Sequence, residues 1–413
     1  MKIKSKYLQM CVLGILAWGC SDTAEEGPVP EPVPVPDAPI TYDFTAEQRR
    51  AAEASTPFMN KFWLEAEAQM GEDNYIVSPL SADVLLSMVA NTSTGGLGKE
   101  IVEALGCSDK TVLNELASKY TVALPSVDSS TTLGIYNSVW YRNQYVMSEN
   151  FADRMKYYFA ADVVAHRFDN SLIQDANSWC SEKTKGLIPN IIKTVPEETA
   201  MLMIDALYLK GAWANPFKAE NTTDEIFHGI KGDSEVKMMN AASMQHYARG
   251  ENFQAVRMEM GCGAIEALFI LPNEGVDMHD FLKSNIEAIH NASFVDKGIY
   301  FSFPRFKFVS NEMSLNDIFM NIGISSINRP DNSNVLEGCE TLMHSIFQRT
   351  SLEFNEKGAE GAAVTWNIPQ GAELGSETEP NPTPVVNVNR PFFLMVRVAA
   401  TGAPLFAGRI NNL

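Results

Sequence analysis

The stretch Phe354-Asn355-Glu356-Lys357-Gly358-Ala359-Glu360-Gly361-Ala362-Ala363-Val364-Thr365 decides the fold of this chain. It begins like a strand, passes through a joint of an acid and glycine, and continues in small residues. A loop of Gly, Pro, Glu and Asn follows over residues 366–384, and residues 391–398 have the pattern of a buried strand. Small residues suit a segment that must slide between two existing strands, because bulky side chains would block its entry.

Other motifs precede and follow this stretch in a fixed order. Asn74-Tyr75-Ile76-Val77-Ser78-Pro79-Leu80-Ser81 indicates a short strand and then a helix, with a hydroxyl cap and proline in its first turn. In Ala206-Leu207-Tyr208-Leu209-Lys210-Gly211-Ala212-Trp213-Ala214-Asn215-Pro216-Phe217, a buried strand passes into a loop closed by two aromatic residues. Phe303-Pro304-Arg305-Phe306-Lys307 and Leu405-Phe406-Ala407-Gly408-Arg409-Ile410 continue the series. Together they resemble the serpin family of serine protease inhibitors over residues 45–413.

The resemblance implies an α+β fold in a domain spanning residues 42–413. The family has helices early in the chain, three mainly antiparallel sheets and an exposed reactive loop, here about residues 356–390. Without the family, the apolar runs and the Gly and Pro turns indicate a mixed α/β protein with helices first and strands later.

The resemblance also implies a reactive bond and a hinge. The bond lies about sixteen residues after Glu356, between Ala372 and Glu373, although cleavage elsewhere in 366–384, for example after Leu374, remains open. The implied hinge residues are Glu356, Gly358, Ala359, Gly361, Ala362 and Ala363.

A polar cluster beneath the opening point of the main sheet, the shutter, is implied at Ser78, Ser81, Asp205 and Gln348. Two of its members depart from the family, which usually has Asn in place of Asp205 and His in place of Gln348. Glutamine can replace some hydrogen bonds of imidazole but cannot carry its charge. We therefore expect the energetics of opening to differ from those of the family.

By the family's mechanism, a protease cleaves the loop and forms an acyl-enzyme, and the freed segment inserts into the main sheet and displaces the protease. The inhibitor needs no catalytic residue of its own. No basic residue lies between Gly358 and Asn389, which argues against trypsin-like targets. Ala or Leu at the bond suits elastase-like, subtilisin-like or papain-like proteases, and Glu373 would suit a glutamyl protease. Elastase-like specificity is our first choice.

Alternate residues of an inserted strand face the core. In the family's register these include Ala359, Gly361, Ala363 and Thr365, which are small and uncharged and favour insertion. Asn367 and Pro369 count against it, because proline lacks an amide donor for a central strand. The alternative is a non-inhibitory serpin that acts as a surface binding or structural lipoprotein.

The N-terminus indicates export. Three lysines precede an apolar run that ends at Cys20, which predicts a signal peptide over residues 1–19. Residues 17–20 resemble a bacterial lipobox, so Cys20 is the expected lipidation site. Alternating prolines over residues 20–41 predict an extended tether of about 60 Å. The expected location is the bacterial cell envelope, at the outer membrane or cell surface, held by the lipid alone, with plain secretion as the alternative.

Charge and composition exclude other functions. The formal net charge is -19, and removal of the three signal-peptide lysines takes it to -22, which disfavours nucleic-acid binding. No nucleotide, zinc-protease or nucleophile-elbow motif is present, so we expect no enzyme, no cofactor and no metal. We expect a monomer. Six cysteines form no CxxC pair, and one disulfide among Cys107, Cys180, Cys262 and Cys339 remains open.

Overall fold

The computed structural model describes residues 40–310, 312–359 and 383–413. The predicted signal peptide, the lipidation site Cys20 and nearly all of the predicted tether lie outside these residues, as does the loop from residue 360 to residue 382. Within the described residues no helix is both long enough and apolar enough to cross a membrane.

The described helices lie mostly in the first half of the chain, as predicted. They are α1 (Ala46–Met70), α2 (Pro79–Thr92), α3 (Gly96–Ala104), α4 (Lys110–Ser118), η1 (Lys119–Ala123), η2 (Leu124–Ser126), α5 (Glu149–Phe159), α6 (Asn170–Lys183), η3 (Ala219–Asn221), α7 (Met278–His290) and α8 (Asn316–Asn321).

The strands become dense after residue 200. They are β1 (Tyr75–Val77), β2 (Thr131–Arg142), β3 (Val146–Met147), β4 (Asp162–His166), β5 (Met201–Ala212), β6 (Thr223–Gly229), β7 (Gly232–Arg249), β8 (Phe253–Met260), β9 (Ile265–Pro272), β10 (Val295–Pro304), β11 (Phe306–Val309), β12 (Met313–Ser314), β13 (Asp331–Glu337), β14 (Cys339–Leu342), β15 (His344–Asn355), β16 (Gly358–Ala359), β17 (Val385–Asn387), β18 (Phe392–Val398) and β19 (Pro404–Ile410).

These strands form three sheets, which confirms the predicted fold class. A seven-stranded sheet has the order β11-β15-β16-β5-β2-β4, with β12 paired to β15. A nine-stranded sheet has the order β1-β19-β18-β9-β8-β7-β10-β17, with β6 paired to β7, and β14-β13-β3 form a small third sheet. Most pairings are antiparallel, but β15 pairs with β5, β2 with β4, and β10 with β17 in parallel.

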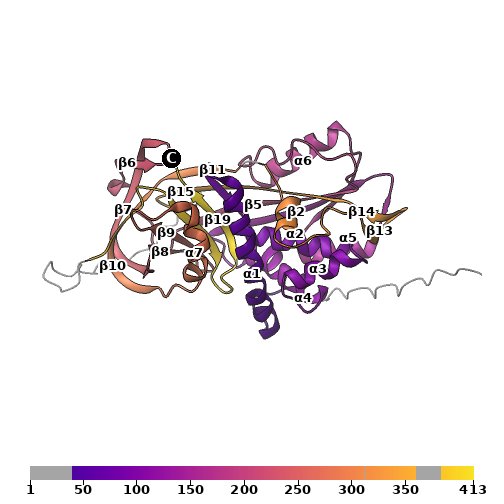
Figure 1. The fold of residues 1–413 in the computed structure, drawn as a ribbon, viewed down its shortest axis with the longest axis horizontal. Coiled ribbons are helices and arrows are strands. Elements are labelled where there is room, and N and C mark those ends of the chain that lie inside the picture. The colour runs from indigo at the N-terminus through magenta and orange to yellow at the C-terminus, as the bar shows by residue number, and fades with distance from the viewer. Residues whose placement is uncertain (1–39, 311, 360–382) are drawn as a thin grey trace, which may run out of the picture. The chain divides into compact units, whose positions relative to one another are not determined.

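Helix α2 lies under the seven-stranded sheet and is buried along its whole length. Ser78 caps it by accepting a hydrogen bond from the Ser81 amide, and Pro79 occupies its first turn, where no amide donor is needed. Figure 1 shows α2, α3 and α5 on one side of this sheet and α6 on the other. A helix with no exposed face requires cover all round, which the sheet and the neighbouring helices α1, α3 and α4 supply.

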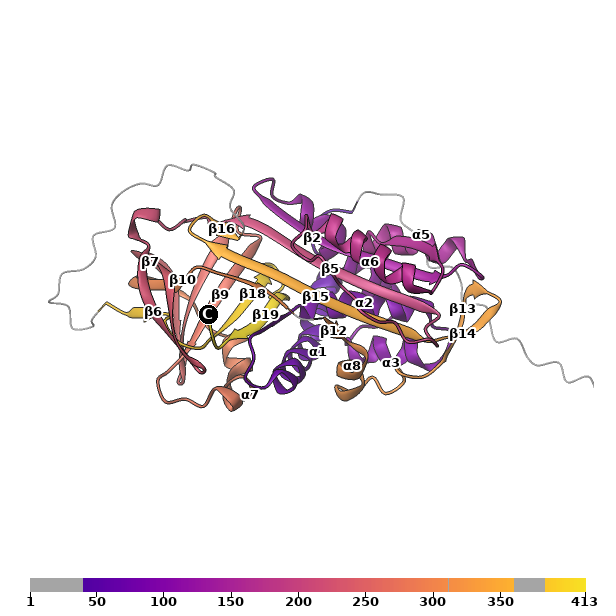
Figure 2. The same ribbon diagram turned by 90° about the horizontal axis from the view of Figure 1, so that it is seen from above.

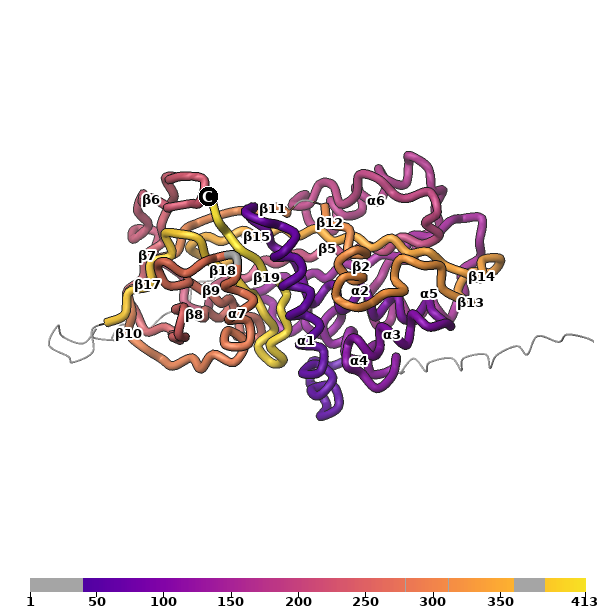
Figure 3. Tube along the Cα trace, in the orientation of Figure 1, coloured from indigo at the N-terminus to yellow at the C-terminus, as the bar shows by residue number. Residues whose placement is uncertain are grey.

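The C-terminal strands complete the main core. In Figure 3, β18 and β19 run beside α1, and the rings of Trp63 and Phe393 meet edge to face. Phe58 and Phe62, four residues apart in α1, are both buried there and pack near Phe319.

A second, smaller core lies between α6 and the seven-stranded sheet. Leu172, Ala176 and Cys180 of α6 pack against Leu202, Ile204 and Ala206 of β5, with Phe347 of β15 beside them. The sheet therefore has an apolar surface on both faces, as expected for a sheet covered by helices on each side. All four cysteines of the described chain are free thiols.

Candidate functional site

The predicted hinge lies at one end of the seven-stranded sheet, between β15 and β5. The chain leaves β15 at Asn355, turns through Glu356 and Lys357, and re-enters the sheet as β16. Ala359 pairs antiparallel with Phe354 on one side and with Gly211 on the other. Figure 2 shows this short strand between the ends of the two long strands. Although the predicted loop range began at residue 356, the sheet has already taken up its first residues.

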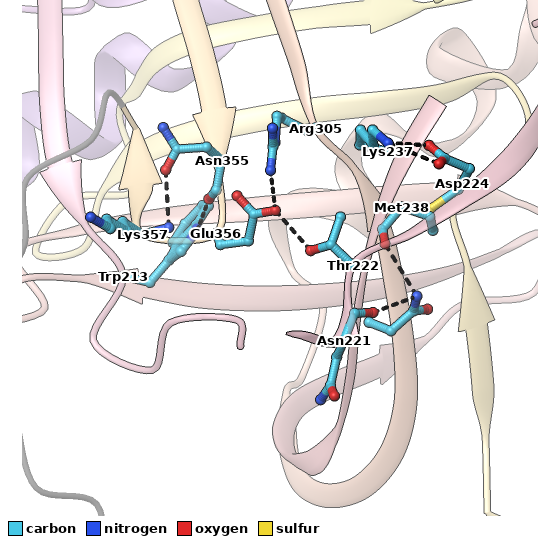
Figure 4. A network of polar contacts seen from close by, with 11 residues as sticks. Trp213, Asn221, Thr222, Asp224, Lys237, Met238, Arg305, Asn355, Glu356 and Lys357 are labelled. Atoms are coloured by element: carbon cyan, nitrogen blue, oxygen red, sulfur yellow. Dashed lines mark hydrogen bonds and ion pairs between the residues drawn. The ribbon is translucent and has the colours of Figure 1, made fainter. Parts of the chain in front are cut away.

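Glu356 is the charged centre of the hinge, and only 8% of its surface is exposed. Its carboxylate forms an ion pair with Arg305 and accepts a 2.7 Å hydrogen bond from the Thr222 hydroxyl. Figure 4 shows the carboxylate between these two groups. Although burial acts to raise the pKa of Glu356, the Arg305 and Thr222 hydrogen bonds lower it below its ordinary value. The hinge carboxylate is therefore ionised and held at neutral pH.

Backbone hydrogen bonds from the loop after β5 fix the turn. The Trp213 amide donates to the Lys357 carbonyl and the Phe217 amide to the Glu356 carbonyl, each at 2.9 Å. The Trp213 indole Nε1 donates to the Asn355 carbonyl at 3.0 Å, and its ring stacks on Phe354 with centroids 5.2 Å apart. The aromatic pair predicted to close this loop therefore holds the hinge.

Gly358 is required by the geometry of the turn. Its φ is +141°, in the region that side chains avoid, and a Cβ there would lie 2.0 Å from the Gly211 carbonyl oxygen. Ala359 is 1% exposed and joins the main core. Only a small, uncharged residue fits that position without rearrangement.

Beyond the hinge, β15 and β5 close against each other. Residues 344–350 of β15 pair in parallel with residues 201–207 of β5, so no strand lies between them there. We call this direct pairing the seam. When two parallel strands separate, an antiparallel strand can enter between them and pair with both. β16 does this at one end of the gap between β15 and β5.

The predicted polar cluster lies under the seam, and the structure brings its four residues together. The Gln348 side chain makes two hydrogen bonds to the backbone of Ser78. Its Oε1 accepts from the Ser78 amide at 2.8 Å, and its Nε2 donates to the Ser78 carbonyl at 2.9 Å. The Ser78 hydroxyl donates to the Ser81 hydroxyl oxygen at 2.9 Å. Glutamine therefore replaces histidine here as a two-sided hydrogen-bonding group without charge.

Asp205 is the fourth member, and it pairs in register with Gln348. Its side chain is fully buried, and burial raises its pKa to about 7, partly offset by the Ser81 hydroxyl. A carboxylate in this position differs chemically from the asparagine expected of the family, because an amide stays neutral at every pH.

A protein-family model described as "Serpin (serine protease inhibitor)" matches residues 53–413. The chain belongs to the serpin family. Serpins are generally protease inhibitors rather than catalytic enzymes.

Relatives are distant but cover most of the serpin. A serine protease inhibitor from Cyanea capillata is 26% identical over 361 residues, which cover 83% of this chain and 93% of that protein. An uncharacterised serpin-like protein from Thermococcus kodakarensis is 25% identical, covering 85% of this chain and 83% of the other.

Solved structures agree on the fold. The thermophilic serpin tengpin in its native state has a TM-score of 0.74 at 25% identity, with 87% of this chain and 95% of tengpin covered. Serpin48 of Tenebrio molitor gives a TM-score of 0.79 at 20% identity, covering 90% and 100% of the two chains.

The predicted site residues divide into two groups. The structure places Glu356, Gly358 and Ala359 in the hinge, and the four predicted shutter residues in the polar cluster. The remaining predicted hinge residues Gly361, Ala362 and Ala363 and the predicted bond at Ala372 and Glu373 lie outside the described residues.

Sequence reasoning missed three residues that hold the hinge: Arg305, Thr222 and Trp213. Each lies in the part of the chain that resembles the family, but nothing in the sequence showed that it contacts the hinge. The only signal in the sequence was an isolated arginine after the Phe-Pro pair at residues 303–304. A pairing across 51 residues of sequence cannot be inferred from local pattern.

Proposed function

We propose that this serpin is a suicide-substrate inhibitor of serine endopeptidases, and also of cysteine endopeptidases, that traps the acyl-enzyme by inserting its cleaved loop along the seam. The observation that carries the proposal is β16, which already occupies the head of the seam between β15 and β5. The loop that follows it needs only to continue in the same register.

That register can be extended residue by residue, because the seam pairs the same residues that would flank an inserted strand. Ala359 pairs with Phe354 of β15 and with Gly211 of β5. Because the pairing is antiparallel, Thr365, six residues later, would lie between Gln348 and Asp205, which are six residues earlier on those strands. Side chains directly opposite each other in a sheet share a face. Because Ala359 faces the main core, so would Gly361, Ala363 and Thr365, all small enough to enter.

The intervening residues would face α6, where the second core offers apolar partners. In the same register, Trp366 would lie between Phe347 and Ile204, both members of that core. Ile368 would meet Leu202 on β5. Burial of these two side chains contributes about 2 kcal/mol each. The alternation of small and large side chains in the loop thus matches the two faces of the sheet.

The two unfavourable residues fall late in the insert. Pro369 would lie ten residues beyond Ala359, between His344 and Met201, the first pair of the seam. A missing amide at the end of a strand is tolerated better than one in its middle. Asn367 would face the core beside Ile346 and Met203, which weakens insertion. The predicted bond at Ala372 would therefore emerge just past the far end of the seam.

The chemistry requires only the protease's own nucleophile. Its serine hydroxyl or cysteine thiol attacks the carbonyl carbon of residue 372, the peptide bond to Glu373 breaks, and the new amine leaves with the proton from the general base. The acyl-enzyme stays attached to residue 372 while the loop inserts. Transport of the protease past the end of the seam distorts its active site, so water cannot complete deacylation.

The partner and location follow from the sequence. Alanine at the bond fits an elastase-like protease first, with subtilisin-like and papain-like enzymes as further partners. The lipid on Cys20 would hold a monomeric inhibitor on the bacterial cell envelope, at the outer membrane or cell surface, with the predicted tether as spacer. Loss of fatty-acid labelling in Cys20→Ala would support this anchor, and retained labelling would reject it.

The decisive experiment is a denaturing gel after mixing the protein with pancreatic elastase, neutrophil elastase, subtilisin or papain. A band at the summed mass that survives boiling shows a trapped acyl-enzyme. Thr365→Arg should abolish this band and leave cleavage intact, because arginine cannot enter between Gln348 and Asp205. Thr378→Arg is the matched control, since it lies beyond the predicted bond and should trap normally.

Cleavage of the unmodified chain with full protease activity remaining across the panel would reject inhibition. It would favour the alternative, a non-inhibitory serpin that acts as a surface binding or structural lipoprotein. Sequencing of the released C-terminal peptide tests the bond separately, and an N-terminus other than Glu373 would reject Ala372–Glu373.

A further inference from the structure

Asp205 lies at the point where the seam has to part. It sits in the middle of β5, paired with Gln348 of β15 on one side and with Asn137 of β2 on the other. Its side chain is 0% exposed, and neither carboxylate oxygen has a hydrogen-bond partner of good geometry among the described residues. A buried carboxyl group without partners is rare, because it loses hydration without compensation.

The neighbour in β2 lacks a hydrogen-bond donor as well. Asn137 donates its Nδ2 to the Phe159 carbonyl at 2.9 Å, which fixes its amide orientation, and its buried Oδ1 has no partner in the described chain. Since residues directly opposite in an antiparallel pair share a face, two acceptors lie on the same side of neighbouring strands. A proton on Asp205 would supply the donor that both lack.

The cluster beneath can provide at most one further donor. The Ser78 hydroxyl proton is already given to Ser81, which leaves the Ser81 hydroxyl proton for Asp205. The Gln348 amide is engaged with the Ser78 backbone through both its oxygen and its nitrogen. The hydrogen bonds around Asp205 can therefore be satisfied when its carboxyl group is neutral, but not when it is charged.

No cation compensates the carboxylate. Arg349, its neighbour in β15, points to the other face and donates to the Ser310 carbonyl at 2.8 Å. Asp83 of α2 is itself a buried acid and adds no positive charge, and the Cys180 thiol of α6, whose pKa burial raises to about 12, stays neutral. His344 at the foot of the seam is also neutral, because burial lowers its pKa to about 4. Within the described residues Asp205 has no ion-pair partner.

We propose that the protonation state of Asp205 sets how readily β5 separates from β15, with the neutral carboxyl group keeping the seam closed and the ionised group easing its opening. This inference rests on the proposed function in one respect: strand insertion requires the seam to open. Asp205 is a positioning residue here, because it touches neither the protease nor the scissile bond.

The direction follows from linkage. Burial raises the pKa of Asp205 to about 7 in the closed sheet, whereas an opened seam would admit water and return that pKa toward its usual value. The closed state therefore binds the proton more tightly than the open one. Its advantage is full only below the usual carboxyl pKa of about 3.9, declines above it, and is lost as the pH rises through about 7. Opening should therefore quicken as the pH rises toward 7 and level off above it.

The test uses the full-length protein and a fluorescein-labelled synthetic peptide with the sequence of residues 360–369, Glu-Gly-Ala-Ala-Val-Thr-Trp-Asn-Ile-Pro, because Ala359 of the protein already occupies the head of the seam. Its rate of insertion into the seam, followed by fluorescence anisotropy, reports opening without any protease. We expect this rate to rise by about tenfold or more between pH 5.5 and 8.5, because the closed-state pKa of about 7 lies more than one unit above the lower end of this range. The peptide's own glutamate titrates below this window.

Two variants, each of which replaces one buried acid, show whether Asp205 causes the pH dependence. Asp205→Asn should insert the peptide at a rate that barely changes with pH, because its amide does not titrate. Asp83→Asn is the matched control: the pKa of Asp83 is likewise raised by burial to about 7, but Asp83 lies in α2 and not in the seam, so the pH profile should persist. The histidines of the protein are the same in all the variants.

A third variant covers the case in which Asp205→Asn does not fold. Ser81→Ala removes the hydroxyl group that lowers the pKa of Asp205, so the midpoint of the pH profile should move to higher pH.

A wild-type insertion rate that does not vary with pH, absence of insertion included, would overturn the inference, as would a profile that survives in Asp205→Asn. A pH-dependent rate in a protein that traps no protease would retain this inference and reject the proposed function. Covalent trapping of a protease together with pH-independent insertion would retain the proposed function and reject this inference.

Discussion

The hinge and the seam are two ends of one gap between β15 and β5, and they are held in opposite ways. At the hinge the gap is already filled by β16, and a charged pair, Glu356 with Arg305, secures the turn. Along the seam the gap is closed by direct strand pairing, and the acid beneath it, Asp205, has no charged partner in the described chain. The hinge is stabilised by an ionised carboxylate, whereas the role proposed for Asp205 has a neutral carboxyl group favour the closed seam.

This contrast explains how one sheet can begin insertion and yet stay closed. The hinge fixes the register and direction of an incoming strand. The seam supplies the resistance, since parting it exposes the Ser78–Gln348 hydrogen bonds and the apolar residues on both faces. A metastable inhibitor needs both properties, because a seam that opened freely would consume the loop before a protease arrived.

The largest effect is expected from Gly358→Ala, which removes the conformation on which the hinge depends. The added Cβ would lie 2.0 Å from the Gly211 carbonyl oxygen at a φ of +141°, so β16 should leave the sheet at a cost of about 3 kcal/mol in unfolding free energy. Urea unfolding measures the change.

Gly402→Ala is the control for this hinge variant. It has a φ of +73° but open space around the new Cβ, so it should cost only about 1 kcal/mol. Equal losses in the two variants would mean that backbone conformation, and not contact with β5, restricts the hinge.

The next effect concerns the seam. Gln348→Met keeps the length of the side chain but leaves the buried Ser78 amide without its partner and removes one of the two hydrogen bonds that the Ser78 carbonyl accepts, the other coming from the Ala82 amide. We expect a loss of about 2 kcal/mol in unfolding free energy. Gln69→Met on the exposed surface of α1 should change it by less than about 0.5 kcal/mol. A loss below about 0.5 kcal/mol for Gln348→Met would show that water replaces the amide.

Arg305→Met tests the charged side of the comparison. It leaves the mostly buried Glu356 with Thr222 as its remaining side-chain partner, at an expected cost of about 1.5 kcal/mol, moderated by the partial exposure of the arginine. The matched control is Lys307→Met, which breaks the exposed pair with Glu353 two residues away and should cost close to nothing. Equal costs would remove the distinction between the hinge pair and a surface pair.

The smallest effect is the response of that hinge pair to acid. The Arg305 and Thr222 contacts lower the pKa of Glu356 in the folded state, so its stabilisation is present above the unfolded pKa of about 4.3 and is lost as the pH falls through the folded value. The penalty of Arg305→Met should therefore shrink toward zero between pH 6 and pH 3 in urea unfolding. A penalty that stays constant would mean that the arginine acts through packing alone.

Much of the site was predictable because it rests on local chemistry. A glycine and small residues after Glu356 indicated a segment that enters a sheet, and Ser78-Pro79 indicated the start of a helix, as found. The partners of those residues were not predictable. Thr222 and Arg305 lie 134 and 51 residues from Glu356, and nothing in a one-dimensional pattern ties them to it. The predicted loop also began too early and ended too late, since β16 and β17 already belong to sheets.

The sequence by itself determined the family, the order of helices before strands, the hinge glycine and the two unusual residues Asp205 and Gln348, because each is a matter of residue type and spacing. Only the tertiary structure decided that β15 and β5 meet directly, that β16 lies between their ends at the hinge, and that Asp205 faces Asn137 with no donor between them among the described residues. Those properties depend on which strands are neighbours in space, and so does the pKa of a buried acid. Sequence fixes which groups are present, and packing fixes whether they keep their water, their partners and their charge.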